Sequence, residues 1–138
     1  MASLEVRRVG QHEFTGHNDR GAEVKVGRSG TPGSFSPGEL LQLAVAACSA
    51  VTAENLITRR VGEDSRFRVA AGAEQQPGGH EYDALRVAFD VDLSGLDEPV
   101  RAQLESTIRH ALDQLCTVTR TVEAGTPVKV GFDHPTID

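Results

Sequence analysis

One apolar stretch in the first half of the chain decides the fold. Residues 36–62 read SPGELLQLAVAACSAVTAENLITRRVG. Ser36 precedes Pro37 and stands three residues before Glu39, which is the spacing of a helix capping box with proline at the first helical position. From residue 40 to residue 51 nearly every side chain is apolar, so the pattern predicts a helix that is buried on all sides.

The same helix is expected to end near residues 59–62, where two arginines precede a glycine, as is common at helix C-termini. With a rise of about 1.5 Å per residue, its apolar part is too short to span a membrane. We therefore expect the central helix of the fold, with alanines that let its neighbours pack closely.

The flanking segments alternate short strands and helices. Residues 4–28 alternate apolar and charged side chains around a turn at 16–21, which predicts a three-strand meander or a hairpin with one extra segment. A loop at residues 29–36 leads into the central helix. The elements expected after that helix are a strand at 67–71, a polar connection at 74–80, a strand at 82–93, an amphipathic helix from about 97 to 115, a short helix at 117–124 and a last strand at 126–132.

This order separates strands from helices, which indicates an α+β fold with antiparallel sheets around the long central helix. A length of 138 residues predicts one domain over residues 1–138. Apolar residues make up 38% of the chain and aromatic residues only 4%, so the core is thin. A chain of this composition often completes its core at a subunit interface, and we expect a two-fold homodimer.

The charge and the N-terminus exclude several classes of protein. The net charge of -6 argues against a nucleic-acid binder and against binding to an anionic membrane surface. The first eight residues carry no apolar signal-peptide core. We expect a cytoplasmic protein with no nucleic-acid or membrane partner.

The chain has two cysteines, Cys48 and Cys116. The plainer interpretation is that both are buried, inert thiols, because free cysteine packs as a small apolar residue. In the cytosol, a disulfide between them would be transient and catalytic or redox-sensing. No paired cysteine or histidine spacing indicates a metal site, and no cofactor is expected.

A peroxide-reducing thiol must be ionised, reachable by the peroxide and close to a group that traps its sulfenic acid. Cys48 lies about three turns into an apolar helix, so the helix dipole gives its thiolate little support. A positive charge from elsewhere is needed, and Arg20 and Arg120 are both candidates. Cys116 follows the last apolar residue of a helix, a place that suits a resolving cysteine.

Two motifs resemble those of the OsmC/Ohr family. Residues 36–48, SPGELLQLAVAAC, resemble the "(S/N)-P-x-E-L-L-x-x-A-x-x-x-C" start of that family's central helix, and residues 116–121, CTVTRT, resemble its second-cysteine motif "C-P-V-S/H-x-T/L". The order of elements is similar along nearly the whole chain. The spacing is more similar to the less characterised OsmC-like branches.

This resemblance implies an intertwined homodimer with an OsmC-like fold. It also implies that Cys48 attacks a hydroperoxide, that Cys116 then forms a disulfide with it, and that a dithiol of the lipoamide type reduces the disulfide. In the family, an Arg from the N-terminal hairpin pairs with a Glu on the central helix and holds the first thiolate. Arg20 and Glu39 are the corresponding residues here. Glu39 stands nine residues before Cys48 where the family's peroxidases have ten, a rotation of about 100°, so Glu39 either reaches Arg20 or only caps the helix.

Two functions therefore stand side by side. The first is a thiol peroxidase that acts in oxidative stress defence and reduces organic hydroperoxides, with hydrogen peroxide as a second candidate substrate. Its site consists of Cys48, Cys116, Arg20 and Glu39. Its apolar pocket lies at the dimer interface, near Phe35 and Leu43. The alternative is a stress protein of the same fold that binds a small apolar ligand at that interface while its thiols stay idle.

Overall fold

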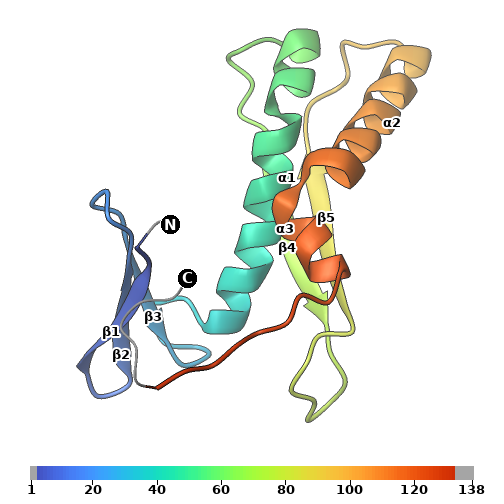
Figure 1. Cartoon of the computed structure of the whole chain (residues 1–138). Coiled ribbons are helices and arrows are strands. Elements are labelled where there is room, and N and C mark those ends of the chain that lie inside the picture. Colours follow the sequence, from blue (N-terminus) through green and yellow to red (C-terminus); the bar gives the residue numbers. More distant parts are fainter. Residues whose placement is uncertain (1–2, 133–138) are drawn as a thin grey trace. The chain divides into compact units, whose positions relative to one another are not determined.

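The computed structural model describes residues 3–132 (Figure 1). Its first element is a three-stranded antiparallel sheet in the order β1-β2-β3, which consists of β1 (Glu5–Gly10), β2 (Glu13–His17) and β3 (Glu23–Gly27). Val6 lies opposite Gly16, and Gly16 lies opposite Val24. The first of the two predicted arrangements, the meander, is confirmed.

Helix α1 (Pro37–Val61) begins and ends where the sequence predicts. The backbone N–H of Ser36 donates to Glu39 Oε1 at 2.9 Å, and the N–H of Glu39 donates to Ser36 Oγ at 3.1 Å. This is the reciprocal capping box expected from the spacing. At the other end Gly62 adopts a φ of 101°, and its N–H donates to the carbonyl oxygen of Thr58 at 2.8 Å. Glycine reaches this left-handed conformation without steric cost.

The prediction that α1 is buried on all sides is wrong for the single chain. One stripe of the helix is buried, and it consists of Val45, Ala46, Ser49, Ala53 and Ile57. On other sides Leu43 is 47% exposed and Val51 is 77% exposed. The stripe repeats every four residues, so the helix packs as a core helix on that face. By length and composition α1 is the one helix in residues 3–132 that could cross a membrane, and the buried stripe identifies it as a core helix.

A second antiparallel sheet consists of the hairpin β4 (Arg68–Glu74) and β5 (Ala84–Asp90). The hairpin is confirmed, with shifted ends. β4 runs three residues beyond the predicted strand because Glu74 still pairs with Ala84, and β5 stops at Asp90 because its partner Arg68 is the first residue of β4. A strand extends only as far as its ladder of hydrogen bonds.

Two helices follow the hairpin. Helix α2 (Glu98–Leu115) buries Leu104 and is the predicted amphipathic helix, and α3 (Thr117–Glu123) is the predicted short helix. Cys116 alone separates them. The end of α2 and the start of α3 are therefore both defined at this cysteine.

The predicted strand at residues 126–132 is not formed. Val128, Val130 and Phe132 are 87%, 77% and 94% exposed, and residues 126–131 have no regular secondary structure. The apolar alternation is present in the sequence, but among the described residues no strand pairs with this segment. A strand cannot form without a partner for its backbone groups.

The chain divides into two compact units, Met1–Leu41 with Val128–Asp138, and Gln42–Pro127. The first unit contains the β1–β3 sheet, and the second contains the β4–β5 hairpin, α2, α3 and most of α1. Helices and antiparallel strands are segregated along the chain, which confirms the α+β class with a long central helix. The homodimer stays a prediction.

Candidate active site

Helix α1 presents Cys48 at the edge of its buried stripe. Cys48 is half-buried, whereas the next residue, Ser49, is 2% exposed. The Ser49 hydroxyl donates to the carbonyl oxygen of Val45 at 2.8 Å, four residues earlier. This bond satisfies the hydroxyl within the helix, so a polar side chain is tolerated on an apolar face.

Cys116 lies at the break between α2 and α3. Its backbone N–H donates to the carbonyl oxygen of Leu112 at 3.1 Å and closes α2, and its own carbonyl accepts from the N–H of Arg120 at 2.9 Å and opens α3. Its backbone is extended, with φ -75° and ψ 96°. The side chain of Cys116 is fully buried.

Both cysteines lie in the second unit. The Cys48 side chain is one of the groups whose hydrogen bonding lowers the pKa of Cys116, although the two residues are 68 positions apart in the sequence, the difference between 116 and 48. Both are free thiols. Cys116 Sγ also lies 3.2 Å from Thr119 Oγ1, and the Ser49 side chain is a further hydrogen-bond partner. The Cys48 thiol is half-buried, and the Cys116 thiol is fully buried.

Two opposing effects act on the pKa of Cys116. Burial raises the pKa, because it penalises the thiolate. Hydrogen bonds from the Cys48 thiol, from the hydroxyl and backbone of Thr119 and from Ser49 lower it. The hydrogen bonds prevail, and the pKa of Cys116 lies below its ordinary value. Cys116 therefore ionises more readily than an ordinary buried thiol.

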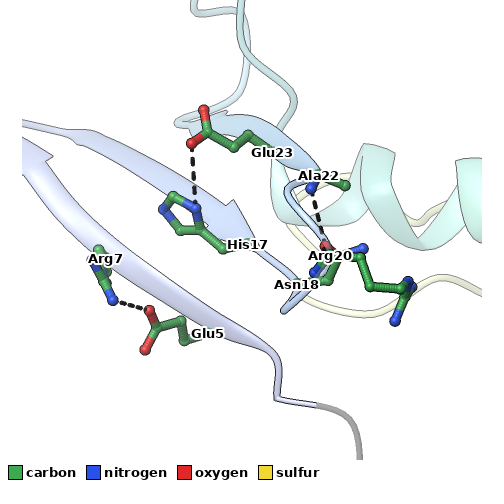
Figure 2. Close-up of polar contacts among 7 residues, drawn as sticks. All are labelled: Glu5, Arg7, His17, Asn18, Arg20, Ala22 and Glu23. Atoms are coloured by element: carbon green, nitrogen blue, oxygen red, sulfur yellow. Dashed lines mark hydrogen bonds and ion pairs between the residues drawn. The ribbon is translucent and has the colours of Figure 1, made fainter.

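Arg20 lies in the turn between β2 and β3, in the first unit (Figure 2). The Asn18 side chain organises this turn, because its Oδ1 accepts the N–H groups of Arg20 at 2.9 Å and of Ala22 at 3.0 Å. The Arg20 guanidinium is 71% exposed and donates to Asp19 Oδ1 at 3.2 Å. The turn therefore holds an exposed cation whose only described partner is a neighbouring surface carboxylate.

The other two candidate residues have local partners. Glu39 is engaged with Ser36 in the capping box, and nine residues of helix place it about half a turn around the axis from Cys48. This contact supports the capping alternative for Glu39. Arg120, the alternative cation, donates through Nη1 to the carbonyl oxygen of Asp113 at 2.7 Å and so joins α3 to the end of α2.

Two residues of the site were missed by sequence reasoning, Ser49 and Thr119. A signal existed for both. Ser49 is the one hydroxyl side chain among the apolar residues 40–51, and Thr119 stands three residues after Cys116, a spacing at which helical side chains meet. In the sequence alone, a hydroxyl group at either position looks like an ordinary polar substitution, because its neighbour, the Cys116 sulfur, is known only from the structure.

A groove of about 450 Å³ lies on the β1–β3 sheet, in the first unit. Its lining residues are Leu4, Glu5, Val6, Gly16, His17, Asn18, Ala22, Glu23 and Val24. His17 Nδ1 lies 3.5 Å from Glu23 Oε1 at its edge, as Figure 2 shows. Phe35 and Leu43, the residues expected beside a substrate pocket, are 41% and 47% exposed.

Comparisons with known proteins agree with this architecture. A family model described as OsmC-like protein matches residues 30–131. An uncharacterized protein of Mycobacterium tuberculosis is 36% identical over 130 residues, which cover 94% of this chain and 95% of that protein. A hypothetical protein from Aquifex aeolicus has a TM-score of 0.68 at 15% identity, over 91% of this chain and 89% of the other. The organic hydroperoxide resistance protein OhrB of Bacillus subtilis has a TM-score of 0.54 at 17% identity, over 88% and 90%. The structural likenesses show a common fold.

Proposed function

Because the chain belongs to the OsmC-like protein family, we propose that it is a cytoplasmic thiol peroxidase that reduces organic hydroperoxides. One observation carries the proposal: half-exposed Cys48 is a neighbour that acts on the pKa of fully buried Cys116. An accessible thiol beside an enclosed one is the arrangement that a peroxidatic and a resolving cysteine need. Two inert packing thiols require no such contact.

The reaction uses both sulfurs. The thiolate of Cys48 attacks one peroxide oxygen, the O–O bond breaks, and the alcohol leaves with a proton, so that Cys48 becomes a sulfenic acid. Cys116 then attacks the Cys48 sulfur, the S–S bond forms and water leaves. The two thiols lose two electrons, and the peroxide gains them. An external dithiol of the lipoamide type reduces the disulfide and completes the cycle.

Arg20 is the cation that the proposal assigns to Cys48. Its guanidinium is exposed and bound only to an adjacent carboxylate among the described residues, so it is available to a thiolate and a peroxide. Arg120 is committed to the α2–α3 junction. The apolar residues that α1 exposes, such as Leu43 and Val51, favour hydroperoxides with an apolar body over hydrogen peroxide.

A homodimer is part of the proposal. Large apolar side chains are exposed on α1, on α2 and in the extended segment after α3, and examples are Val51, Leu115 and Phe132. Few apolar side chains in residues 3–132 are fully buried. A second copy would cover these surfaces and complete a core that one chain leaves thin.

The ligand-binding alternative keeps one supporting observation, the groove of about 450 Å³ on the β1–β3 sheet. A volume of this size suits a small molecule. In that case the thiols would take no part, and a hydroperoxide would leave both unchanged.

Mass spectrometry of the two cysteines tests the proposal. The reduced protein is treated with one equivalent of cumene hydroperoxide, blocked with an alkylating agent and digested without reduction. Because the chain has only two cysteines, a Cys48–Cys116 disulfide can be assigned without ambiguity. We expect that disulfide in stoichiometric yield. Two alkylated thiols and no consumption of peroxide would contradict the proposal and favour the ligand-binding alternative.

Variants complete the test. Cys48→Ser removes the attacking sulfur and should lose all turnover. Cys116→Ser should oxidise at Cys48, accumulate sulfenic and then sulfinic acid, and not turn over. Full activity in Cys48→Ser would show that the site is assigned wrongly.

A further inference from the structure

The two cysteines differ in how closely a dissolved molecule can approach their sulfurs. Cys116 is 0% exposed, whereas Cys48 is half-buried and the residue before it, Ala47, is exposed. Thiol–disulfide exchange needs direct contact between the attacking sulfur and the sulfur under attack, so access helps to select which sulfur reacts. The two ends of a Cys48–Cys116 disulfide are therefore not equivalent to a reducing agent.

The backbone around Cys116 holds this residue in its enclosed position. Its N–H donates to the carbonyl oxygen of Leu112 at 3.1 Å, and its carbonyl oxygen accepts the N–H of Arg120 at 2.9 Å. Arg120 Nη1 also donates to the carbonyl oxygen of Asp113 at 2.7 Å, which links α3 to the end of α2. Turning the backbone of Cys116 outward would break these bonds, so that movement requires the α2–α3 junction to open locally.

Thr119 covers the Cys116 sulfur. The Cys116 thiol donates to Thr119 Oγ1 at 3.2 Å, and Thr119 is itself half-buried. Two other side chains act on the same sulfur, those of Cys48, which is half-buried, and Ser49, which is 2% exposed. Of these three neighbours, Thr119 is the one that lies near solvent on the side of α3. An attacking molecule that approaches Cys116 from that side must therefore pass the Thr119 side chain.

We propose that the reducing dithiol attacks the Cys48 sulfur of the disulfide and that Cys116, covered by Thr119, is the leaving sulfur. The proposal rests on the peroxidase function and specifies how its reductive half proceeds. The peroxide and the reductant then react in turn with the same accessible sulfur. The pKa of Cys116, which lies below its ordinary value, acts in the same direction, because a thiol of lower pKa leaves faster.

The steps balance in protons and electrons. One thiol of the reductant loses its proton and attacks the Cys48 sulfur, a mixed disulfide forms, and the bond between Cys48 and Cys116 breaks. Cys116 leaves with the electron pair and takes up that proton. The second thiol of the reductant then attacks its own sulfur in the mixed disulfide, and Cys48 leaves and takes up the second proton. Two electrons pass from the dithiol to the protein, and the reductant becomes a cyclic disulfide.

The first experiment identifies the sulfur that the reductant attacks. The disulfide is formed with diamide instead of a peroxide, so the result does not depend on peroxidase activity. A short pulse of β-mercaptoethanol, which has no second thiol, stops the exchange at the mixed disulfide. The products are quenched in acid, alkylated with N-ethylmaleimide at mildly acidic pH, digested without reduction and mapped by mass spectrometry.

We expect β-mercaptoethanol on Cys48 and maleimide on Cys116. The reverse distribution, or equal amounts of β-mercaptoethanol on both cysteines, would overturn the proposal and leave the peroxidase function standing. A disulfide that forms with diamide but not with cumene hydroperoxide would contradict the peroxidase function, and the site of attack would still be measured.

Single-cysteine variants measure access without any disulfide. Cys116→Ser leaves Cys48 as the one thiol, and Cys48→Ser leaves Cys116. We expect methyl methanethiosulfonate to modify Cys48 at least about tenfold faster than Cys116 in the folded variants, because a buried thiol reacts through local opening. In concentrated urea the two rates should become similar. A Cys116 thiol that reacts as fast as Cys48 in the folded state would contradict the proposal.

The cover over Cys116 is tested with matched variants in the Cys48→Ser background. Thr119→Ala removes most of the covering side chain and keeps a good helix former, so the modification of Cys116 should become several-fold faster. Losing the Thr119 hydroxyl raises the pKa of Cys116 and by itself slows the reaction, so a faster rate reports access. Thr119→Ser should stay slow, as should Thr121→Ala, which changes an exposed threonine of the same helix. Equal rates in Thr119→Ala and Thr121→Ala would contradict the covering role of Thr119.

Discussion

At Cys116, burial and hydrogen bonding act on the same sulfur in opposite directions. Burial disfavours the thiolate, and the donors of Cys48, Thr119 and Ser49 favour it, with a pKa below the ordinary value as the result. This balance depends on side chains from two parts of the second unit, α1 and α3. The ionisation of Cys116 therefore depends on where individual hydrogen-bonding groups lie, which the number of cysteines in the sequence does not show.

We expect substitutions of Arg20 and Arg120 to affect different properties of the protein. Arg20→Ala should slow the oxidation of Cys48 by about tenfold or more, because a cation near a thiolate typically favours ionisation by one pKa unit or more. Arg120→Ala should keep the rate and lower the free energy of unfolding by about 1 kcal/mol, through the lost hydrogen bond to Asp113. Single-turnover kinetics and urea unfolding measure the two effects. If Arg120→Ala slowed the oxidation and Arg20→Ala did not, the assignment would be reversed.

At the scale of the element, helix α1 carries a capping box at its N-terminus and Cys48 in its interior. The capping box of Ser36 and Glu39 fixes where the helix starts, and this start sets the face on which Cys48 lies. Because Cys48 stands nine positions after Glu39, the two residues face nearly opposite sides of the helix. The helix terminus thus positions the cysteine without touching it.

The capping box can be tested apart from the chemistry. Ser36→Ala should lower the free energy of unfolding by about 1 kcal/mol, the usual effect of losing a helix cap. Glu39→Gln should preserve stability, because glutamine also completes a capping box, and should preserve the rate of Cys48 oxidation. Thermal unfolding and single-turnover kinetics provide the comparison. A slow but stable Glu39→Gln variant would show that the carboxylate acts on the active site as well.

At the scale of the whole molecule, the exposed apolar surface leads us to expect a dimer. The segment after α3 alternates Val128, Val130 and Phe132, all more than three-quarters exposed, with Lys129 and Gly131 between them. Such alternation is typical of a strand with one buried face. The segment has the sequence pattern of a strand, but no strand within residues 3–132 pairs with it.

A charge placed in this segment should therefore disrupt the dimer. Val130→Asp puts a carboxylate where an apolar contact is expected, and burying an unpaired charge is strongly unfavourable. We expect a dimer for the wild type and a monomer for Val130→Asp in sedimentation velocity at the same concentration. Lys129→Asp, which alters the other face of the segment, is the matched control and should remain dimeric. A monomeric wild type, or a dimeric Val130→Asp variant, would contradict the prediction.

The sequence by itself determined the local features. Apolar periodicity and the capping box predicted α1 and α2, because these depend on contacts a few residues apart, and left two arrangements open for residues 4–28, of which the structure forms the meander. The motifs around Cys48 and Cys116 indicated the family, which the comparisons confirm.

The tertiary structure alone decided the features that depend on distant residues. It placed Cys48, Ser49 and Thr119 where they act on the pKa of Cys116, left one side of α1 exposed and left residues 126–132 without a ladder. Neither a hydrogen bond between residues far apart in the chain nor the absence of a strand partner follows from local periodicity. Cys48 and Cys116, two separate candidates in the sequence, are neighbours in the folded second unit.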